Sequence, residues 1–147
     1  MSDTSSNRPQ PIDLAARALQ HRDRSSRQLD DRLARAGIAD DARAETLQRL
    51  ERLGYVDDAR YAAGRAATLA ARGYGDDAIR HALAEAGVAD EQAEQALAGL
   101  DPESERARLL VGKLGATAKT LAALRRKGFT EDALESIGSF AEGDERA

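Results

Sequence analysis

The sequence predicts an all-α protein: an elongated, curved array of three tandem three-helix, helix-turn-helix-like repeats without a sheet. Three features of the 147-residue chain support this class. Apolar residues recur at the i, i+3, i+4, i+7 spacing of helices that bury one face. Glycine follows most of these segments, and the pattern returns after roughly 50 residues, as in helical repeat proteins. No segment shows the sustained two-residue alternation of a half-buried strand.

The residues that flank the apolar segments predict where each helix begins and ends. Asp, Ser or Thr is expected at each start, because its side-chain oxygen accepts the unpaired N–H groups of a first turn. Nine helices are predicted, running over about Pro11–Arg22, Ser25–Gly37, Asp40–Gly54, Asp57–Arg72, Gly75–Gly87, Asp90–Leu100, Pro102–Leu114, Thr117–Gly128 and from Thr130 onward. Asp101 is expected to cap the seventh helix, with Pro102 at its first position.

Each predicted helix has an apolar face. In the same order, these faces are formed by Ile12, Ala15, Ala16 and Leu19; Leu29, Leu33 and Ala36; Leu47 and Leu50; Tyr61 and Leu69; Ile79, Leu83 and Ala86; Ala93, Ala96, Leu97 and Leu100; Leu110, Val111 and Leu114; Leu121 and Leu124; and Leu134 and Ile137. Large aromatic residues make up only 3% of the chain, so the core is expected to be thin.

Internal repetition divides the chain. A shift of about 50 residues places Leu33 on Leu83 and Gly37 on Gly87, and a weaker copy places Gly87 on Gly128. The predicted divisions are a disordered tail (1–11), repeats over 12–56, 57–100 and 101–138, and a flexible tail (139–147). A single repeat buries its apolar faces poorly, so neighbouring repeats are expected to stack.

Composition limits the classes of function. The formal net charge of −4 argues against a general binder of polyanions, although residues 15–37 carry a net charge of +3 and residues 57–100 one of −4. The chain has no Cys, which excludes disulfides and thiol nucleophiles. No apolar run approaches the ~20 residues of a membrane span, so we expect no membrane contact and a cytoplasmic protein.

Catalytic chemistry is not expected. The two histidines, His21 and His81, stand alone among helical charges, without a second ligand at metal-binding spacing. The carboxylate pairs Asp30-Asp31, Asp76-Asp77 and Asp90-Glu91 lie mostly at helix starts, where they offset the helix dipole. No glycine-rich loop follows a strand. The sequence therefore predicts a protein that is not an enzyme and uses no cofactor or metal.

Basic side chains are the remaining candidates for function. Arg22, Arg24 and Arg27 cluster at the first joint, and Arg125 to Lys127 end the eighth helix. The late cluster is explained at least as well by the helix dipole, which favours cations at a C-terminus. The early cluster extends beyond a helix end, so contact with a polyanion or an acidic partner stays open. Readout of DNA bases is poorly supported, because no helix carries the expected Arg, Asn and Gln set.

The stretch LGYVDDARY forms the predicted joint between the first two repeats. Gly54 is expected to end one repeat, and Asp57 or Asp58 to cap the next helix. Tyr55 and Tyr61 are expected to pack across the joint, with direct contact to a partner as the alternative. The full inter-repeat motif is predicted to comprise Gly54, Tyr55, Asp57, Asp58, Tyr61, Gly73, Tyr74 and Gly75.

Five segments carry a resemblance to a known family. They are LGYVDDARYA (Leu53–Ala62), ARGYG (Ala71–Gly75), the run Ile79, Leu83, Gly87 and Val88, RDRSSRQLDDRLARAGI (Arg22–Ile38) and RRKGFTEDAL (Arg125–Leu134). In this order and spacing they resemble the RecX family, regulatory proteins of the RecA recombinase, over roughly residues 12–138. The chain departs from the family pattern at Ala62-Ala63-Gly64, where an aromatic is usual, at Ala82, where Glu is frequent, and at Asp76-Asp77, where basic or neutral residues are common.

The resemblance implies three tandem three-helix repeats that form an arc. It also implies binding in the groove of the RecA–single-stranded DNA filament, with inhibition or tuning of strand exchange, ATP hydrolysis and coprotease activity. We further expect a monomer with weak contact to single- or double-stranded DNA. A nucleic-acid-binding module without RecA dependence and a scaffold for another protein are the alternatives. The candidate contacts are Arg22, Arg24, Arg27, Arg32, Arg60, Arg72, Arg125, Arg126 and Lys127.

Overall fold

The computed structural model describes residues 9–145, with side chains described as far as Gly138. This part of the chain contains nine α-helices and no strand, which confirms the all-helical prediction. None of these helices combines the length and the hydropathy that a membrane span requires. In chain order they are α1 (Pro11–Leu19), α2 (Ser26–Arg35), α3 (Asp40–Arg52), α4 (Asp58–Ala71), α5 (Asp76–Glu85), α6 (Asp90–Ala98), α7 (Glu103–Leu114), α8 (Ala118–Arg126) and α9 (Glu131–Glu145).

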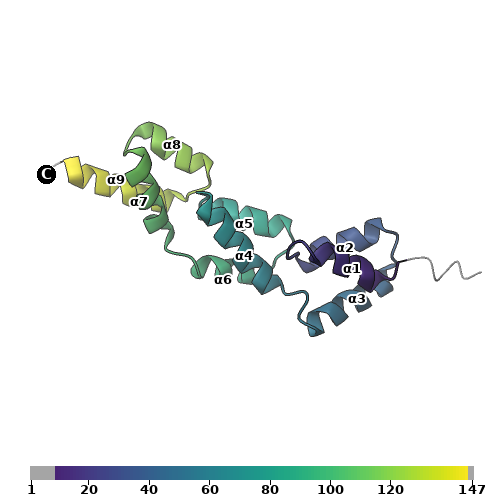
Figure 1. The fold of residues 1–147 in the computed structure, drawn as a ribbon. Helices are drawn as coiled ribbons and strands as arrows, with labels where there is room; N and C mark the ends of the chain where they lie inside the picture. The colour runs from purple at the N-terminus through teal and green to yellow at the C-terminus, as the bar shows by residue number, and fades with distance from the viewer. Residues whose placement is uncertain (1–8, 146–147) are drawn as a thin grey trace, which may run out of the picture.

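The helices pack in three consecutive groups of three. We call them unit 1 (α1 to α3), unit 2 (α4 to α6) and unit 3 (α7 to α9), because the helix pairs in closest contact all lie within one group. Figure 1 shows the units following one another along the molecule, so that its shape is elongated. We call the two junctions seam 1–2 and seam 2–3.

Each unit has a small apolar core of its own. Leu29 and Leu50 lie in the core of unit 1, Ile79 and Leu83 in that of unit 2, and Ile137 in that of unit 3. Among the described residues, none of these cores draws members from two units. The expectation that units stack in order to bury their apolar faces is therefore wrong. The units are joined by polar contacts and by close backbone approach, which apolar periodicity does not reveal.

The helix starts follow the predicted capping chemistry only in part. Ser25 caps α2 in a full capping box with Gln28, and the side chains of Asp57 and Thr117 cap α4 and α8. Elsewhere the expected acid is one position too far along the chain to cap. Asp40 and Asp90 are the first helical residues of α3 and α6, where they offset the dipole. Asp101 does not cap α7 either: the N-cap is Pro102, which makes no side-chain hydrogen bond, and the helix begins at Glu103.

The ends of the helical array also differ from the prediction. α1 stops at Leu19 instead of Arg22, and the Arg24 Nε–H donates to the free carbonyl of Ala18 at 2.8 Å, closing the helix. α9 continues to Glu145, past residue 138, where a flexible tail was expected. A glycine such as Gly138 costs about 1 kcal/mol inside a helix without ending it. Residues 1–8 of the expected N-terminal tail lie outside the described part.

Tyr55 does not pack across seam 1–2 as predicted. Its side chain is 60% exposed and borders a shallow apolar pocket formed with Ile12 and Leu19, all within unit 1. The neighbouring Val56 is 3% exposed and fills the core of unit 1 in its place. Sequence position alone does not distinguish these two adjacent apolar residues, because the turn after Gly54 decides which of them faces inward.

This assignment predicts unequal losses of stability at adjacent positions. Tyr55→Ala should lower the free energy of unfolding by less than about 1 kcal/mol, as at exposed sites in general. Val56→Ala should lower it by about 2 kcal/mol, because it opens a cavity in the core. Urea denaturation of the two variants beside the wild type measures both values. A larger loss for Tyr55→Ala than for Val56→Ala would show that the tyrosine has a buried role.

Candidate functional site

Seam 1–2 joins the start of α2 to unit 2. The Ser25 hydroxyl donates to the carbonyl of Ala86, at the end of α5, at 2.5 Å. The Ser26 backbone N–H donates to the Asp58 carboxylate, at the start of α4, at 2.8 Å. The first amides of a helix have no partner within the helix, so Asp58 supplies an acceptor that α2 lacks. The contacts of unit 2 thus complete the start of α2.

Seam 2–3 repeats this arrangement one unit further along the chain. The Gly75 N–H, at the N-cap of α5, donates to the carbonyl of Lys127, at the end of α8, at 2.9 Å. The Asp76 N–H donates to the Glu103 carboxylate, at the start of α7, at 2.7 Å. In both seams the second helix of one unit begins on the end of the second helix of the next. In both, an acidic residue at the start of the next unit's first helix accepts the first helical N–H.

Close backbone approach completes each seam. A Cβ atom on Gly128 would lie 2.5 Å from the Cβ of Ala78, and one on Gly87 would lie 2.6 Å from the Cβ of Arg27. Both glycines have left-handed backbones, with φ of +87° and +82°. Gly37, the matching residue of unit 1, has φ of +83° but nothing within 4 Å, because no unit precedes it in the structure. Gly87 and Gly128 are therefore required both by their left-handed backbone and by the closeness of the neighbouring helix.

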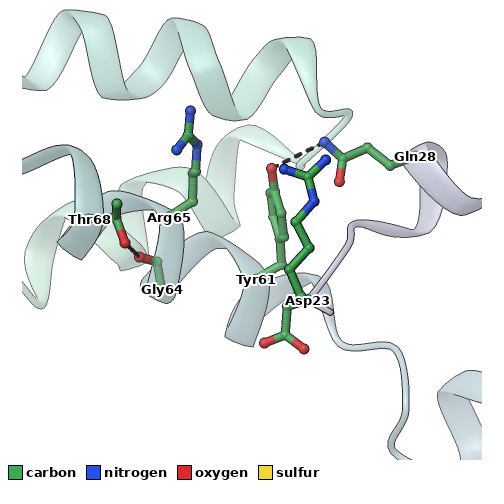
Figure 2. A pocket seen from close by; sticks show the side chains of 7 residues that line it. Asp23, Gln28, Tyr61, Gly64, Arg65 and Thr68 are labelled. Carbon is green, nitrogen blue, oxygen red and sulfur yellow. Dashed lines mark hydrogen bonds between the residues drawn. The ribbon is translucent and has the colours of Figure 1, made fainter. Parts of the chain in front are cut away.

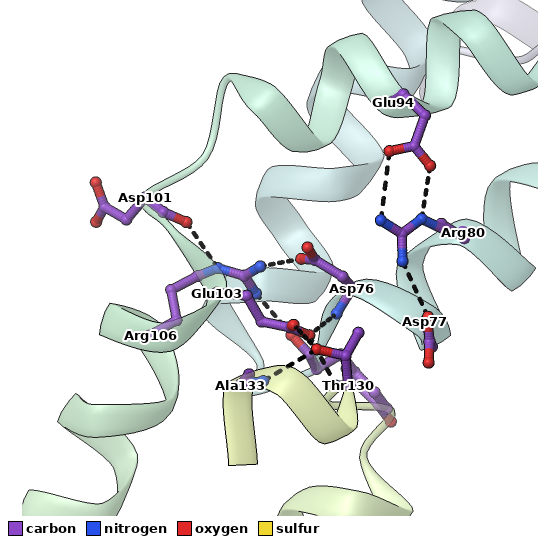
Figure 3. Close-up of polar contacts among 10 residues, drawn as sticks. Asp76, Asp77, Arg80, Glu94, Asp101, Glu103, Arg106, Thr130 and Ala133 are labelled. Carbon is purple, nitrogen blue, oxygen red and sulfur yellow. Dashed lines mark hydrogen bonds and ion pairs between the residues drawn. The ribbon is translucent and has the colours of Figure 1, made fainter. Parts of the chain in front are cut away.

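A charged network covers seam 2–3 (Figure 3). Arg106 pairs with the Asp76 carboxylate and donates to the carbonyls of Tyr74, at 3.1 Å, and Asp101, at 3.0 Å. Glu103 accepts from the Thr130 hydroxyl at 2.5 Å as well as from Asp76 N–H. The network accounts for the acid at Asp76, because Arg106 of unit 3 supplies its counter-charge.

Burial and the neighbouring Glu103 carboxylate raise the pKa of Asp76 above its ordinary range, although Arg106 opposes the shift. The folded protein therefore binds this proton more tightly than the unfolded chain. The stability that Asp76 contributes is fully present below its unfolded-state pKa and is lost as pH rises through its folded-state pKa.

The Asp76→Asn variant tests this titration. We expect the stability of the wild type relative to Asp76→Asn to decrease as the pH rises from the acidic range toward neutrality. The measurement is urea denaturation of both proteins at a series of pH values. If the difference between the two free energies of unfolding does not change with pH, the Asp76 carboxyl is not held in an environment that disfavours its charge.

A basic pocket of about 380 Å³ opens at seam 1–2 (Figure 2). Tyr61 and Arg65 project from α4 toward the same side, and the Gln28 Nε2–H of α2 donates to the Tyr61 hydroxyl oxygen at 3.2 Å. The single acid of the pocket, Asp23, is paired with Arg60 at 3.3 Å. The pocket is lined by Arg22, Asp23, Gln28, Tyr61, Gly64, Arg65 and Thr68.

Positive charge is concentrated around this pocket. Within the described part of the chain, the guanidinium groups of Arg22 and Arg65 take part in no hydrogen bond or ion pair. Burial lowers the pKa of Arg24, and the nearby charges of Arg22 and Arg32 lower it further. Residues 59–75 contain no acid, so α4 presents a basic surface although residues 57–100 are acidic in total. The pocket is suited to bind an anion.

The predicted cationic contacts fall into two groups. Arg27 donates to the carbonyls of Ala84 and Glu85, Arg60 to those of Gly54 and Tyr55, and Arg125 pairs with Glu131, while the Lys127 ammonium lies 4.1 Å above the Tyr74 ring. These four side chains, like Arg24, hold the fold together. The second group has no side-chain hydrogen bond or ion pair among the described residues and comprises Arg22, Arg32, Arg72 and Arg126.

Comparison with known proteins identifies the architecture. The model of the first RecX three-helix domain matches residues 12–50, and that of the second matches residues 57–97. A regulatory protein RecX from Xanthomonas axonopodis pv. citri (strain 306) is 31% identical over 140 residues, covering 88% of this chain and 86% of that protein. The chain belongs to the RecX family. A regulatory protein RecX from Chromohalobacter salexigens is 41% identical over 96 residues, covering 65% of this chain and 63% of that protein.

Solved RecX structures share the fold. The crystal structure of RecX from Lactobacillus salivarius has a TM-score of 0.77 at 23% identity, covering 90% of this chain and 94% of that chain. A second crystal structure, of a regulatory protein RecX, has a TM-score of 0.74 at 22% identity and covers 88% and 73% of the two chains. Membership of the RecX family confirms that the chain is a regulatory protein and not an enzyme. It also implies RecA as the partner protein.

Arg65 is a member of the RecX basic pocket that the sequence analysis missed. It lies four residues after Tyr61 on α4, so the two side chains share one helix face. The absence of acids from residues 59–75, around Tyr61, indicated a basic surface. The net charge of −4 over residues 57–100 concealed this local excess of positive charge. The described residues hold no group of three or more His, Cys, Asp and Glu side chains that could bind a metal ion.

Proposed function

We propose that this RecX-family protein binds in the groove of the RecA–single-stranded DNA filament and lowers RecA's ATP hydrolysis, strand exchange and coprotease activity. The observation that carries the proposal is the family match, which includes both RecX domains and 88% of the chain. The proposed site of action is the cytoplasm, where the filament forms.

The seams support binding to an extended partner. Because the same contacts join unit 1 to unit 2 and unit 2 to unit 3, the three units form one continuous surface. An elongated array of this kind can contact neighbouring RecA protomers at the same time, which strengthens binding beyond that of one unit. Contact with neighbouring protomers along the groove requires the array to be curved, and the proposal predicts this curvature.

Co-sedimentation tests the proposal. RecA is assembled on single-stranded DNA with a slowly hydrolysed ATP analogue, and the protein is added at moderate salt before centrifugation. We expect the protein to pellet with the filament and to stay in the supernatant with RecA alone. If it stays in the supernatant with the assembled filament at stoichiometric excess, the proposal is wrong.

We also propose that the protein acts as a monomer. Among the residues whose side chains are described, the exposed large apolar ones are divided between two distant units: Leu53 and Tyr55 in unit 1, and Leu109 and Leu114 in unit 3. Stable homodimers usually bury one continuous apolar surface. A nucleic-acid-binding role without RecA is the second candidate function, and the basic pocket favours it. In that case, the protein would bind single-stranded DNA whether or not RecA is present.

A further inference from the structure

We propose that the two ends of the array bind each other in neighbouring copies of this chain, so that copies join head to tail. In this contact the start of α8 of one copy lies on the end of α2 of a second copy, as in seams 1–2 and 2–3. The contact does not depend on the proposed partner filament. Units 1 and 3 lie at opposite ends of the molecule (Figure 1), so a single copy does not close the contact on itself.

The second helices of the three units form a line in which each helix begins on the end of the next. α2 begins on the end of α5, where the Ser25 hydroxyl donates to the Ala86 carbonyl. α5 begins on the end of α8, where the Gly75 N–H donates to the Lys127 carbonyl. The start of α8 and the end of α2 are therefore the two unused halves of one repeated interface. Such halves are complementary, which identifies the occupant as a second copy of the chain.

The start of α8 exposes groups that the other two starts bury. Thr117 is the N-cap of α8, as Ser25 is of α2 and Gly75 of α5, but Thr117 is exposed whereas Ser25 and Gly75 are buried. Its hydroxyl donates to that of Thr120 at 3.1 Å, and a carbonyl of a second copy can accept this proton instead, because a hydroxyl group rotates.

The second residue of α8 is also available to a second copy. Lys119 is exposed and has no side-chain hydrogen bond or ion pair within the described part of the chain. It occupies the position that Arg27 has in α2, and Arg27 donates to two carbonyls at the end of α5. Lys119 can therefore donate to the carbonyls at the end of α2 in a second copy.

The end of α2 is the matching acceptor. Ala36 is the C-cap of α2, as Ala86 is of α5, but Ala36 is exposed whereas Ala86 is buried. The Ala36 carbonyl accepts no hydrogen bond among the described residues. Next to it, Gly37 shares the left-handed backbone of Gly87 and Gly128 and has nothing within 4 Å of a Cβ position. At Gly87 and Gly128 that space is filled by the start of a neighbouring helix.

The contact between copies lacks one group of the internal seams. Asp58 and Glu103, the first residues of α4 and α7, accept the first N–H of a neighbouring second helix. α1 begins with Pro11, whose side chain has no acceptor. The contact is therefore weaker than the internal seams, and dilute protein stays monomeric. It adds nothing to the binding of a single copy, so substitution of Gly37 leaves inhibition by isolated molecules unchanged.

Cysteine cross-linking tests the contact, because the chain has no Cys of its own. Ala36→Cys/Lys119→Cys places one cysteine at each free end and is treated with a short bis-maleimide linker at about 1 mM protein, where a contact of millimolar Kd is populated. We expect denaturing electrophoresis to show a ladder of dimers, trimers and longer chains, because a head-to-tail contact is repeated at each new end. Circular dichroism establishes that each variant is folded.

Two matched variants serve as controls. Asp77→Cys/Lys127→Cys occupies the equivalent positions of seam 2–3, so it should be linked within one chain and form no ladder. Ala36→Cys/Arg126→Cys moves the second cysteine to the other end of α8, about 10 Å away along the helix axis. It should give only the products of random collision.

A third variant tests the close approach at Gly37. Gly37→Ala, added to Ala36→Cys/Lys119→Cys, should reduce the ladder to the level of the Arg126→Cys control. The reason is that its Cβ atom would meet the incoming start of α8, as a Cβ atom on Gly87 or Gly128 would meet the neighbouring helix. Within a single chain the same Cβ atom meets nothing, so the fold should be retained.

Three results would overturn the inference: no ladder above the Arg126→Cys control, a ladder that Gly37→Ala leaves unchanged, or dimers formed by Ala36→Cys alone, which would show that two copies meet through unit 1. On RecA filaments, products that join the chain to RecA in place of the ladder would also overturn it, by assigning the ends to that partner. A protein that forms the ladder but does not sediment with RecA filaments contradicts the proposed function and leaves this inference standing.

Discussion

Gly128→Ala should destabilise the protein far more than Gly37→Ala, although both replace a left-handed glycine at the same position of a unit. Each alanine is strained by its positive φ, which costs about 1 kcal/mol. At Gly37 nothing lies within 4 Å of the new Cβ. At Gly128 the Cβ would lie 2.5 Å from the Cβ of Ala78 and 2.6 Å from its backbone N, so seam 2–3 must open. We expect a further loss of about 2 kcal/mol from this overpacking.

Urea denaturation measures the difference in the free energy of unfolding between the two variants. Amide hydrogen exchange shows which part of the structure is destabilised. The Asp77 N–H donates to the Gly128 carbonyl at 3.0 Å, and the Gly75 N–H donates to that of Lys127. Both amides should exchange faster in Gly128→Ala and at the wild-type rate in Gly37→Ala. Equal losses of stability in the two variants would mean that the backbones of units 2 and 3 are not in close contact.

Arg106→Ala is expected to have the second large effect. The Arg106 side chain is 11% exposed and its partner Asp76 is 18% exposed, so the substitution leaves the Asp76 carboxylate partly buried without its ion-pair partner. Removing one member of a buried pair costs about 3 kcal/mol or more. Arg80→Ala is the matched control, since Arg80 also forms ion pairs, with Glu94 and Asp77, but is 41% exposed. It should cost less than about 1 kcal/mol.

A double-mutant cycle separates the charge from the packing of Arg106. If the unpaired carboxylate causes the loss, Arg106→Ala/Asp76→Asn should be more stable than Arg106→Ala alone. Free energies of unfolding from urea denaturation give all four corners of the cycle. Additive effects of the two substitutions would show that Arg106 acts through its contacts with the carbonyls of Tyr74 and Asp101 instead.

The helices and their order were predictable because local patterns determine them. Apolar spacing placed residues such as Leu29, Leu83 and Leu124 correctly inside, and the glycines at 37, 87 and 128 marked matching helix ends. Exact starts were harder to predict. An acid offsets the helix dipole from the N-cap or from the first turn, so the sequence did not show that Asp57 caps a helix while Asp40 lies inside one.

The seams could not be predicted from helical patterns. Their partners are backbone groups far apart in the chain, such as the Ser25 hydroxyl and the Ala86 carbonyl, and any residue type supplies a carbonyl. For the same reason, sequence patterns do not distinguish the role of Arg22 from that of Arg27. Arg27 binds the carbonyls at the end of α5, whereas Arg22 lines the basic pocket. Arg65 was missed because the acids elsewhere in residues 57–100 outweigh its charge, and because the pocket that it lines also needs Arg22 and Gln28 of unit 1.

RecA's ATP hydrolysis on single-stranded DNA tests the central claim most directly, with the wild type and the Gly37→Ala and Gly128→Ala variants titrated at a temperature where all three are folded. A regulator that binds as one array should lower hydrolysis at the same concentration as the wild type when Gly37 is replaced. It should need roughly tenfold more protein when Gly128→Ala opens seam 2–3 and removes multivalent contact. An unchanged rate of hydrolysis at stoichiometric excess of the wild type, or equal inhibition by the two variants, would contradict the account.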